Sequence, residues 1–151
     1  MIAGCLEIGD VALCQPYEHG DGSTSDAKFI VISGISAERH VLYFVCTSQE
    51  KHGKTKSPAC QANHFNSSYV IEPPPKKKGK FKAKQRDGFS KLTWVDLVPE
   101  IELEEALRER FQSGRMQRRF ALADHEFQGL VACFRVCPDC APIHLSYLGL
   151  A

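Results

Sequence analysis

Residues 9–49 read GDVALCQPYEHGDGSTSDAKFIVISGISAERHVLYFVCTSQ, and this stretch decides the fold. It predicts three short strands, at residues 10–15, 28–34 and 40–46. The second and third strands contain β-branched and aromatic side chains in runs of five or fewer apolar residues. Such runs are typical of short strands buried on both faces rather than of helices. We therefore expect a small, strongly bent antiparallel sheet.

Polar segments flank these strands. The loop at residues 16–26 is rich in Gly, Ser and Asp, which favour turns and local hydrogen bonds from side chain to backbone. The third strand is followed by Thr47, Ser48 and Gln49, which supply two hydroxyls and an amide. These residues either make turns at the strand end or lie at the rim of the sheet, where a rigid scaffold presents them to a ligand.

The rest of the chain predicts two more strands and then two helices. Strand patterns occur at residues 65–72 and 89–98, after which the period of the apolar residues changes from two to 3.6. Helices are expected at residues 100–112 and 115–135, and Asp124 could cap and split the second one. A short tail follows.

These elements predict an α+β fold in two parts. Residues 1–98 would form a small antiparallel SH3-like barrel of about five strands, with a flexible basic loop at residues 73–88. Residues 99–151 would form a helical extension, two C-terminal helices and the tail, packed on the barrel.

Composition and length indicate an ordinary globular protein. With 151 residues, of which 43% are hydrophobic, the chain can bury about two thirds of its unfolded surface. No run of about 18 apolar residues occurs, and the N-terminus lacks a basic region, so we expect a cytoplasmic protein with no membrane partner. Seven cysteines, an odd number, favour thiols or a metal site over a disulfide framework.

Positive charge is concentrated in one stretch. Residues 76–91 hold eight basic side chains and one acid, a net charge of +7, and the whole chain carries +1, so the remainder carries −6. The stretch is either a solvated loop or an electrostatic contact for phosphates. The side chains that would bind RNA are Lys76, Lys77, Lys78, Lys80, Lys82, Lys84 and Arg86.

The C-terminal cysteines provide a second kind of candidate site. Cys137 and Cys140 have the Cys-x-x-Cys spacing of a zinc knuckle, and Cys133 or His144 would complete a tetrahedron. A single such pair is not enough to establish a zinc site, and Cys133 is expected to face the core of a helix. We expect no cofactor, with zinc as the alternative.

The N-terminal half resembles the MazF/PemK family of toxin endoribonucleases over roughly residues 9–98. The resemblance is carried by the Gly-Asp-Val strand, the Gly/Ser-rich loop, the strand AKFIVIS at residues 27–33 and the tripeptide at residues 47–49. The LTWV stretch is similar to a later strand of the family. The family's arginine before the buried strand falls on Ala27. Either Lys28 supplies the cation, or it comes from elsewhere in the chain, or the activity is changed or lost.

The resemblance implies the toxin of a toxin–antitoxin system, a homodimer that is inhibited by an antitoxin protein. It implies metal-independent RNA cleavage, in which the ribose 2′-hydroxyl attacks the adjacent phosphate and leaves a cyclic phosphate and a 5′-hydroxyl. Such a reaction needs an acceptor for the 2′ proton, an acid for the leaving oxygen and donors aimed at the phosphorane. The expected catalytic residues are Thr47, Ser48 and Gln49 for orientation, Lys28 for charge, and His52 for proton transfer.

Two other functions fit the same sequence. One is a catalytically inactive SH3-like barrel that binds nucleic acid through the basic loop at residues 76–86, and the missing arginine favours it. The other is an interaction domain stabilised by zinc.

Overall fold

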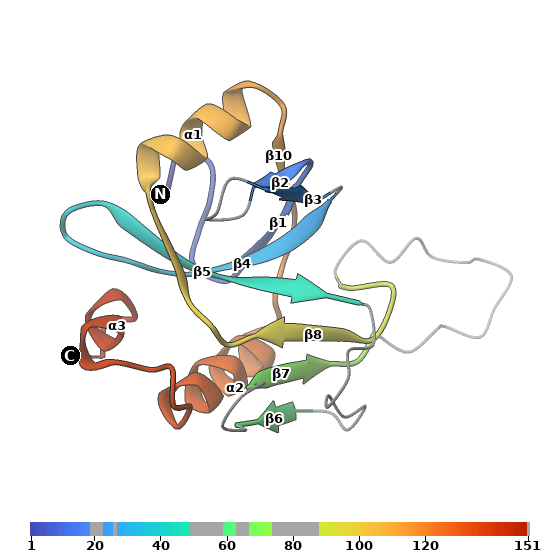
Figure 1. Cartoon of the computed structure of the whole chain (residues 1–151), viewed down its shortest axis with the longest axis vertical. Coiled ribbons are helices and arrows are strands. Elements are labelled where there is room, and N and C mark those ends of the chain that lie inside the picture. The colour runs from blue at the N-terminus through green and yellow to red at the C-terminus, as the bar shows by residue number, and fades with distance from the viewer. Residues whose placement is uncertain (19–22, 26, 49–58, 63–66, 74–87, 151) are drawn as a thin grey trace, which may run out of the picture.

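The computed structural model combines an antiparallel sheet with helices (Figure 1). It describes the whole chain except residues 19–22, 26, 49–58, 63–66, 74–87 and 151. Within the described part, the strands are β1 (Asp10–Cys14), β2 (Tyr17–Glu18), β3 (Thr24–Ser25), β4 (Lys28–Ile35), β5 (His40–Thr47), β6 (Ala59–Gln61), β7 (Ser68–Ile71), β8 (Thr93–Asp96), β9 (Glu100–Leu103) and β10 (Met116–Ala121). The helices are α1 (Glu104–Gln112), α2 (Asp124–Arg135) and α3 (Pro142–Tyr147).

Eight of the described strands form one antiparallel sheet, so the expected α+β class is confirmed. The order of its strands is β10-β1-β4-β5-β8-β7-β6, with β9 also paired to β5, while β2 and β3 pair separately. In the described part of the chain the end strands β10 and β6 are not paired with each other, so the sheet is open as described. Strands β1, β4 and β5 agree with the prediction to within one residue at each end.

The predicted helix at residues 115–135 is wrong in its first half. Residues 116–121 form β10, which pairs along the free edge of β1, and the helix α2 begins only at Asp124. Met116 and Phe120 have the four-residue spacing of a helical stripe, but in β10 they reach the cores on opposite faces of the sheet. Residues four positions apart share one face of a regular strand, and the β-bulge between these two shifts the alternation so that they point to opposite faces.

The predicted helix at residues 100–112 also begins too early. Residues 100–103 form β9, and α1 follows without a break. The sheet therefore continues across residue 98, because β9 and β10 both belong to it.

Strand β5 determines the shape of the sheet because one of its edges has two partners. Residues 40–43 of β5 pair with β9, and Cys46 and Thr47 pair with β8. The chain passes from β8 to β9 through Leu97 and Pro99, while β4 covers the other edge of β5. Strands β4 and β5 are therefore central.

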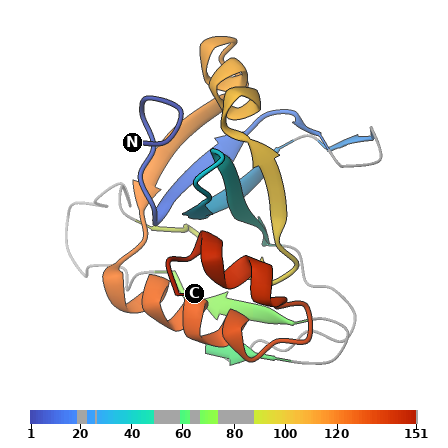
Figure 2. The same cartoon turned by 90° about the vertical axis from the view of Figure 1, so that its left-hand side faces the viewer.

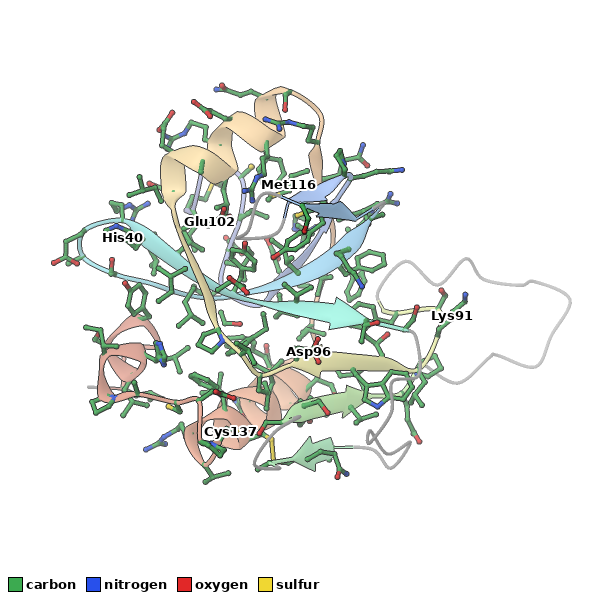
Figure 3. All side chains as sticks on the ribbon, in the orientation of Figure 1. His40, Lys91, Asp96, Glu102, Met116 and Cys137 are labelled. Carbon is green, nitrogen blue, oxygen red and sulfur yellow. A yellow bond between two sulfur atoms is a disulfide. The ribbon has the colours of Figure 1, made fainter. Side chains whose placement is uncertain are left out.

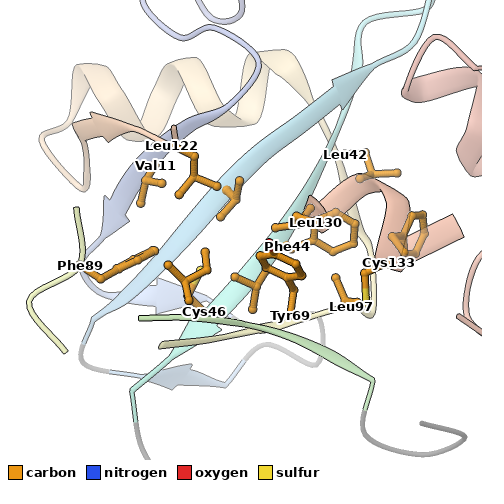
Figure 4. Close-up of a cluster of buried hydrophobic side chains, with 14 of the residues drawn as sticks. Val11, Leu42, Phe44, Cys46, Tyr69, Phe89, Leu97, Leu122, Leu130 and Cys133 are labelled. Carbon is orange, nitrogen blue, oxygen red and sulfur yellow. The ribbon is translucent and has the colours of Figure 1, made fainter. Parts of the chain in front are cut away.

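Two cores lie on the opposite faces of β4 and β5, as their apolar runs predict. Val31 and Phe44 belong to one core (Figure 4), and Ile30 and Tyr43 belong to the other. The first core takes in Leu130 and Phe134 of α2, and the second takes in Leu107 of α1.

The three described helices contact different parts of the sheet (Figures 1 and 2). Helix α1 packs against β9 and β10, α2 against β6 and β7, and α3 against β4 and β5. Gly34 in β4 permits the approach of α3, because a Cβ there would lie 2.8 Å from the carbonyl carbon of Tyr147. Within the part of the chain that is described, no helix is both long and apolar enough to cross a membrane.

The expectation that the cysteines would be thiols or metal ligands is wrong for one pair. A disulfide joins Cys60 of β6 to Cys133 of α2, although the two residues are 73 positions apart in the chain. The sequence did not predict a strand at β6, and so did not reveal that these two cysteines are neighbours. The cysteines that remain free are Cys5, Cys14, Cys46, Cys137 and Cys140.

Candidate functional site

A pocket of about 750 Å³ opens where β4 begins and β5 ends. This volume lies within the range of about 300–1,000 Å³ that is usual for small-molecule sites. Its walls come from β1, β4, β5, β8 and β10, together with the segment that precedes β8. Five strands that are far apart in the sequence therefore contribute to a single concave surface.

Three phenylalanines form the apolar part of the pocket. The rings of Phe29 and Phe89 meet edge to face with centroids 5.6 Å apart, and those of Phe89 and Phe120 do so at 5.0 Å. Phe89 and Phe120 are almost fully buried and belong to the first core, where Figure 4 shows Phe89 beside β1 and β4. Because their rings are held by the core, this side of the pocket is rigid.

Lys28 and Thr47 lie at the ends of neighbouring strands, at the rim of the pocket. Phe29 of β4 pairs with Cys46 of β5, and each of the two residues lies one position beyond this last pair of the ladder. Both residues line the pocket, which therefore combines a hydroxyl with a cation.

The two hydroxyls that follow one another in the chain have different exposures. Thr47 is only 4% exposed, so most of its side chain is covered by its neighbours and it belongs to the pocket wall. Ser48 also lines the pocket and is exposed to solvent. Ser48 therefore presents its hydroxyl to an entering ligand more openly than Thr47.

Two further cations line the pocket that sequence reasoning missed. Lys91, just before β8 (Figure 3), and Arg119 of β10 join Lys28 there. Within the described part of the chain, none of the three is ion-paired with a carboxylate. Since the described residues that line the pocket include no acid, its field is positive and favours an anionic ligand.

Neither missed residue carried a sequence signal that was strong enough to find it. The predicted strand begins at residue 89, four residues before β8 begins at Thr93, so the prediction puts Lys91 inside the strand and not in the segment before it. Arg119 falls in a segment that the sequence predicts as helix. It lines the same pocket as residues of β4 and β5 only because this segment forms the strand β10 and joins the sheet.

Cys46 contributes a thiol to the pocket wall, but one that is suited to packing. Burial raises the pKa of the Cys46 thiol, and the nearby carboxylate of Asp96 raises it further, while Lys28 lowers it by less. The thiol therefore stays protonated at neutral pH and is a poor nucleophile.

The other predicted site residues lie elsewhere. Gln49, His52 and the basic side chains at residues 76–86 are outside the described residues. Of the alternative zinc ligands, Cys133 forms the disulfide with Cys60. The buried Cys137 thiol donates a hydrogen bond to the carbonyl of Cys133 at 3.1 Å. The Nδ1 atom of His144 accepts a hydrogen bond from the N–H of Ala141 at 3.0 Å. Among the residues that the structure describes, no three metal-binding side chains come together, and Cys133, Cys137, Cys140 and His144 form no such group.

Comparison of the chain with family models, with curated proteins and with solved structures found no match.

Proposed function

We propose that this chain is a metal-independent endoribonuclease, the toxin component of a toxin–antitoxin system, as its resemblance to the MazF/PemK family implies. The observation that carries the proposal is the meeting of Lys28 and Thr47 at the rim of a positively charged pocket. The resemblance implies Thr47, and Lys28 is one candidate to replace the family's missing arginine; both residues line the pocket.

The proposed reaction makes and breaks one bond to phosphorus. The 2′-oxygen of a ribose binds the adjacent phosphorus and gives up its proton to a base, and the bond to the 5′-oxygen breaks as that oxygen takes up a proton. Lys28 would neutralise charge on the non-bridging oxygens, and the hydroxyls of Ser48 and Thr47 would donate hydrogen bonds to them. His52 is the sequence candidate for proton transfer.

The proposal includes the finer properties that the resemblance implies. An SH3-like barrel is one of them; what favours it is the strongly bent course of an antiparallel sheet in which β5 has both β8 and β9 along one edge. A homodimer in the cytoplasm, RNA as substrate and an antitoxin that occupies the pocket complete it. An acidic antitoxin segment would suit the three cations.

The ends of the cleaved RNA provide the test. We expect the purified chain to cut a mixed-sequence RNA in the presence of EDTA, and to leave 5′-hydroxyl ends that polynucleotide kinase labels without prior dephosphorylation. RNA with a 2′-deoxy substitution at the cleaved position should resist, because it lacks the nucleophile. Lys28→Ala should lower the rate about 10²-fold or more, whereas Arg135→Ala removes the same charge from the far end of α2 and should have no effect. Intact RNA, or products with 5′-phosphates, would refute the proposal.

The same pocket also supports a second function, binding of nucleic acid without cleavage. Three cations beside an apolar aromatic surface fit a phosphate and a base whether or not a proton is transferred. In that case Lys28→Ala would weaken RNA binding and make it less dependent on salt concentration. Neither the wild-type chain nor any variant would cleave the RNA.

A further inference from the structure

Strand β10 is irregular at one residue, Arg119. Arg118 pairs with Ala12 and Phe120 pairs with Val11, so two consecutive residues of β1 face two residues of β10 that are not consecutive. Arg119 is thus the extra residue of a β-bulge. Bulges recur next to active sites, where they redirect a side chain.

The bulge lets Arg119 and Phe120, which are consecutive in the chain, line the same pocket. In a regular strand successive side chains point to opposite faces, so only one of the two would do so. In the structure both Arg119 and Phe120 line the pocket, while the guanidinium of Arg118 binds the carboxylate of Asp10 at 3.0 Å. Two neighbouring arginines therefore have separate tasks.

Arg119 also differs from four other described arginines in its partners. Within the described residues, four arginines bind carboxylates: Arg39 with Glu104, Arg108 with Glu105, Arg110 with Glu102 and Arg118 with Asp10. Arg119 is exposed and forms no ion pair with any described residue. Its guanidinium is available to a ligand in the pocket.

We infer that Arg119 is a catalytic residue of the proposed ribonuclease, and that its guanidinium binds the scissile phosphate. The inference rests on the proposed function and extends it to β10, outside the residues that resemble the MazF/PemK family. It gives the pocket the guanidinium that Ala27 does not supply.

The chemistry of the proposed step explains why an arginine matters there. Negative charge grows on the two non-bridging oxygens while the 2′-oxygen bonds to phosphorus and the bond to the 5′-oxygen breaks. A guanidinium is planar and donates two parallel hydrogen bonds, so it binds both oxygens at once, whereas Lys28 and Lys91 act as point charges. Arg119 neither gains nor loses a proton, since a guanidinium stays charged in proteins.

Single-turnover cleavage combined with a binding measurement tests this role. We expect Arg119→Ala to lower the cleavage rate about 10²–10³-fold, while its affinity for a 2′-O-methyl RNA of the same sequence changes less than about tenfold. Arg119→Lys should recover only part of the rate, because it restores the charge without the two parallel hydrogen bonds. Guanidinium chloride at millimolar concentration should partly rescue Arg119→Ala and have no such effect on the wild-type chain.

A matched variant tests whether the bulge itself is required. Gln117 lies two residues before Arg119 on the same strand, in regular register with Leu13. The double variant Arg119→Gln/Gln117→Arg keeps the net charge of the strand but moves the guanidinium away from the bulge. It should cleave as slowly as Arg119→Gln alone, and recovery of the wild-type rate would overturn the inference.

The outcomes separate this inference from the proposed function. If the wild-type chain does not cleave RNA, both fail. If it cleaves and Arg119→Ala is equally fast, the function stands and the role of Arg119 is refuted. If rate and affinity fall together, Arg119 only binds RNA and is not catalytic. Circular dichroism shows which variants fold. If Arg119→Ala does not fold, the comparison of Arg119→Lys with the wild-type chain tests the inference instead.

Discussion

Lys28 and Thr47 line one pocket from the neighbouring strands β4 and β5, each one residue beyond the last pair of the ladder, Phe29 with Cys46. A cation and a hydroxyl in this relation can both reach the same phosphate group. Their contributions to cleavage should therefore depend on one another, which is the first prediction.

We expect Lys28→Ala and Thr47→Val each to lower the cleavage rate about 10²–10³-fold. The rate of the double variant should fall by much less than the product of the two single effects, because both side chains act on the same phosphate group. Single-turnover rates of the four chains give the coupling directly. Strictly multiplicative effects would show that the two side chains act on different groups.

Glu104 should make stability depend on pH. Hydrogen bonds from Arg39, and from the N–H of Ala3 at 2.8 Å, lower the pKa of the Glu104 carboxyl in the folded chain. A lowered pKa stabilises the fold above the pKa of the unfolded carboxyl, near 4.3, and this contribution disappears as the pH falls through the folded value.

Urea unfolding of the wild type and of Glu104→Gln between pH 2 and 7 measures this contribution. The difference in free energy of unfolding should be constant above about pH 5 and shrink towards zero in acid. The control is Glu105→Gln, since Glu105 is 63% exposed and its ion pair with Arg108 should contribute little. Equal behaviour of the two variants would contradict the assignment.

The disulfide between Cys60 and Cys133 should stabilise the chain strongly. It closes a loop across 73 positions, which corresponds to about 4 kcal/mol if the chain entropy of the unfolded state is the main term. Reduction with TCEP, or Cys60→Ala with Cys133→Ala, should lower the free energy of unfolding by about 2–4 kcal/mol. Titration of the denatured, unreduced chain should find five thiols, and seven thiols would show that the bond is absent.

Gly34 should be intolerant of any side chain. A Cβ at this position would overlap the backbone carbonyl of Tyr147, which cannot rotate away as a side chain can. Gly34→Ala should cost about 1–3 kcal/mol and release α3, so that limited proteolysis cuts within residues 142–147. Gly129→Ala is the comparison, because the group in its way is the hydroxyl end of the Tyr69 side chain. A smaller loss for Gly34→Ala than for Gly129→Ala would contradict the argument.

The sequence predicted the centre of the fold because the strands there combine local propensity with burial. In β4 and β5 the apolar runs are too short for helices and leave no polar face, so only buried strands fit them. The resemblance implies Thr47 and leaves Lys28 as one replacement for the missing arginine; the structure has both among the residues that line the pocket.

The periphery depended on contacts that a single sequence does not show. Residues 116–121 form a strand because β1 offers an unpaired edge, and that tertiary demand outweighs the helical spacing of Met116 and Phe120. Arg119 could not be assigned to the pocket without the strand β10, and Cys60 could not be paired with Cys133 without β6 and α2. The positions of Gln49 and His52 stay predictions, because these residues lie outside the described part of the chain.

Strand β10 has a consequence for self-association of the sheet. Among the described strands it pairs only with β1, so in the described part of the chain its other side is an edge of the sheet. Exposed Gln117, Arg118 and Arg119 lie along that edge, and the bulge breaks its regular spacing. Charge repulsion and irregular geometry make it a poor template for a strand of another molecule, so the chain is protected there against edge-to-edge aggregation.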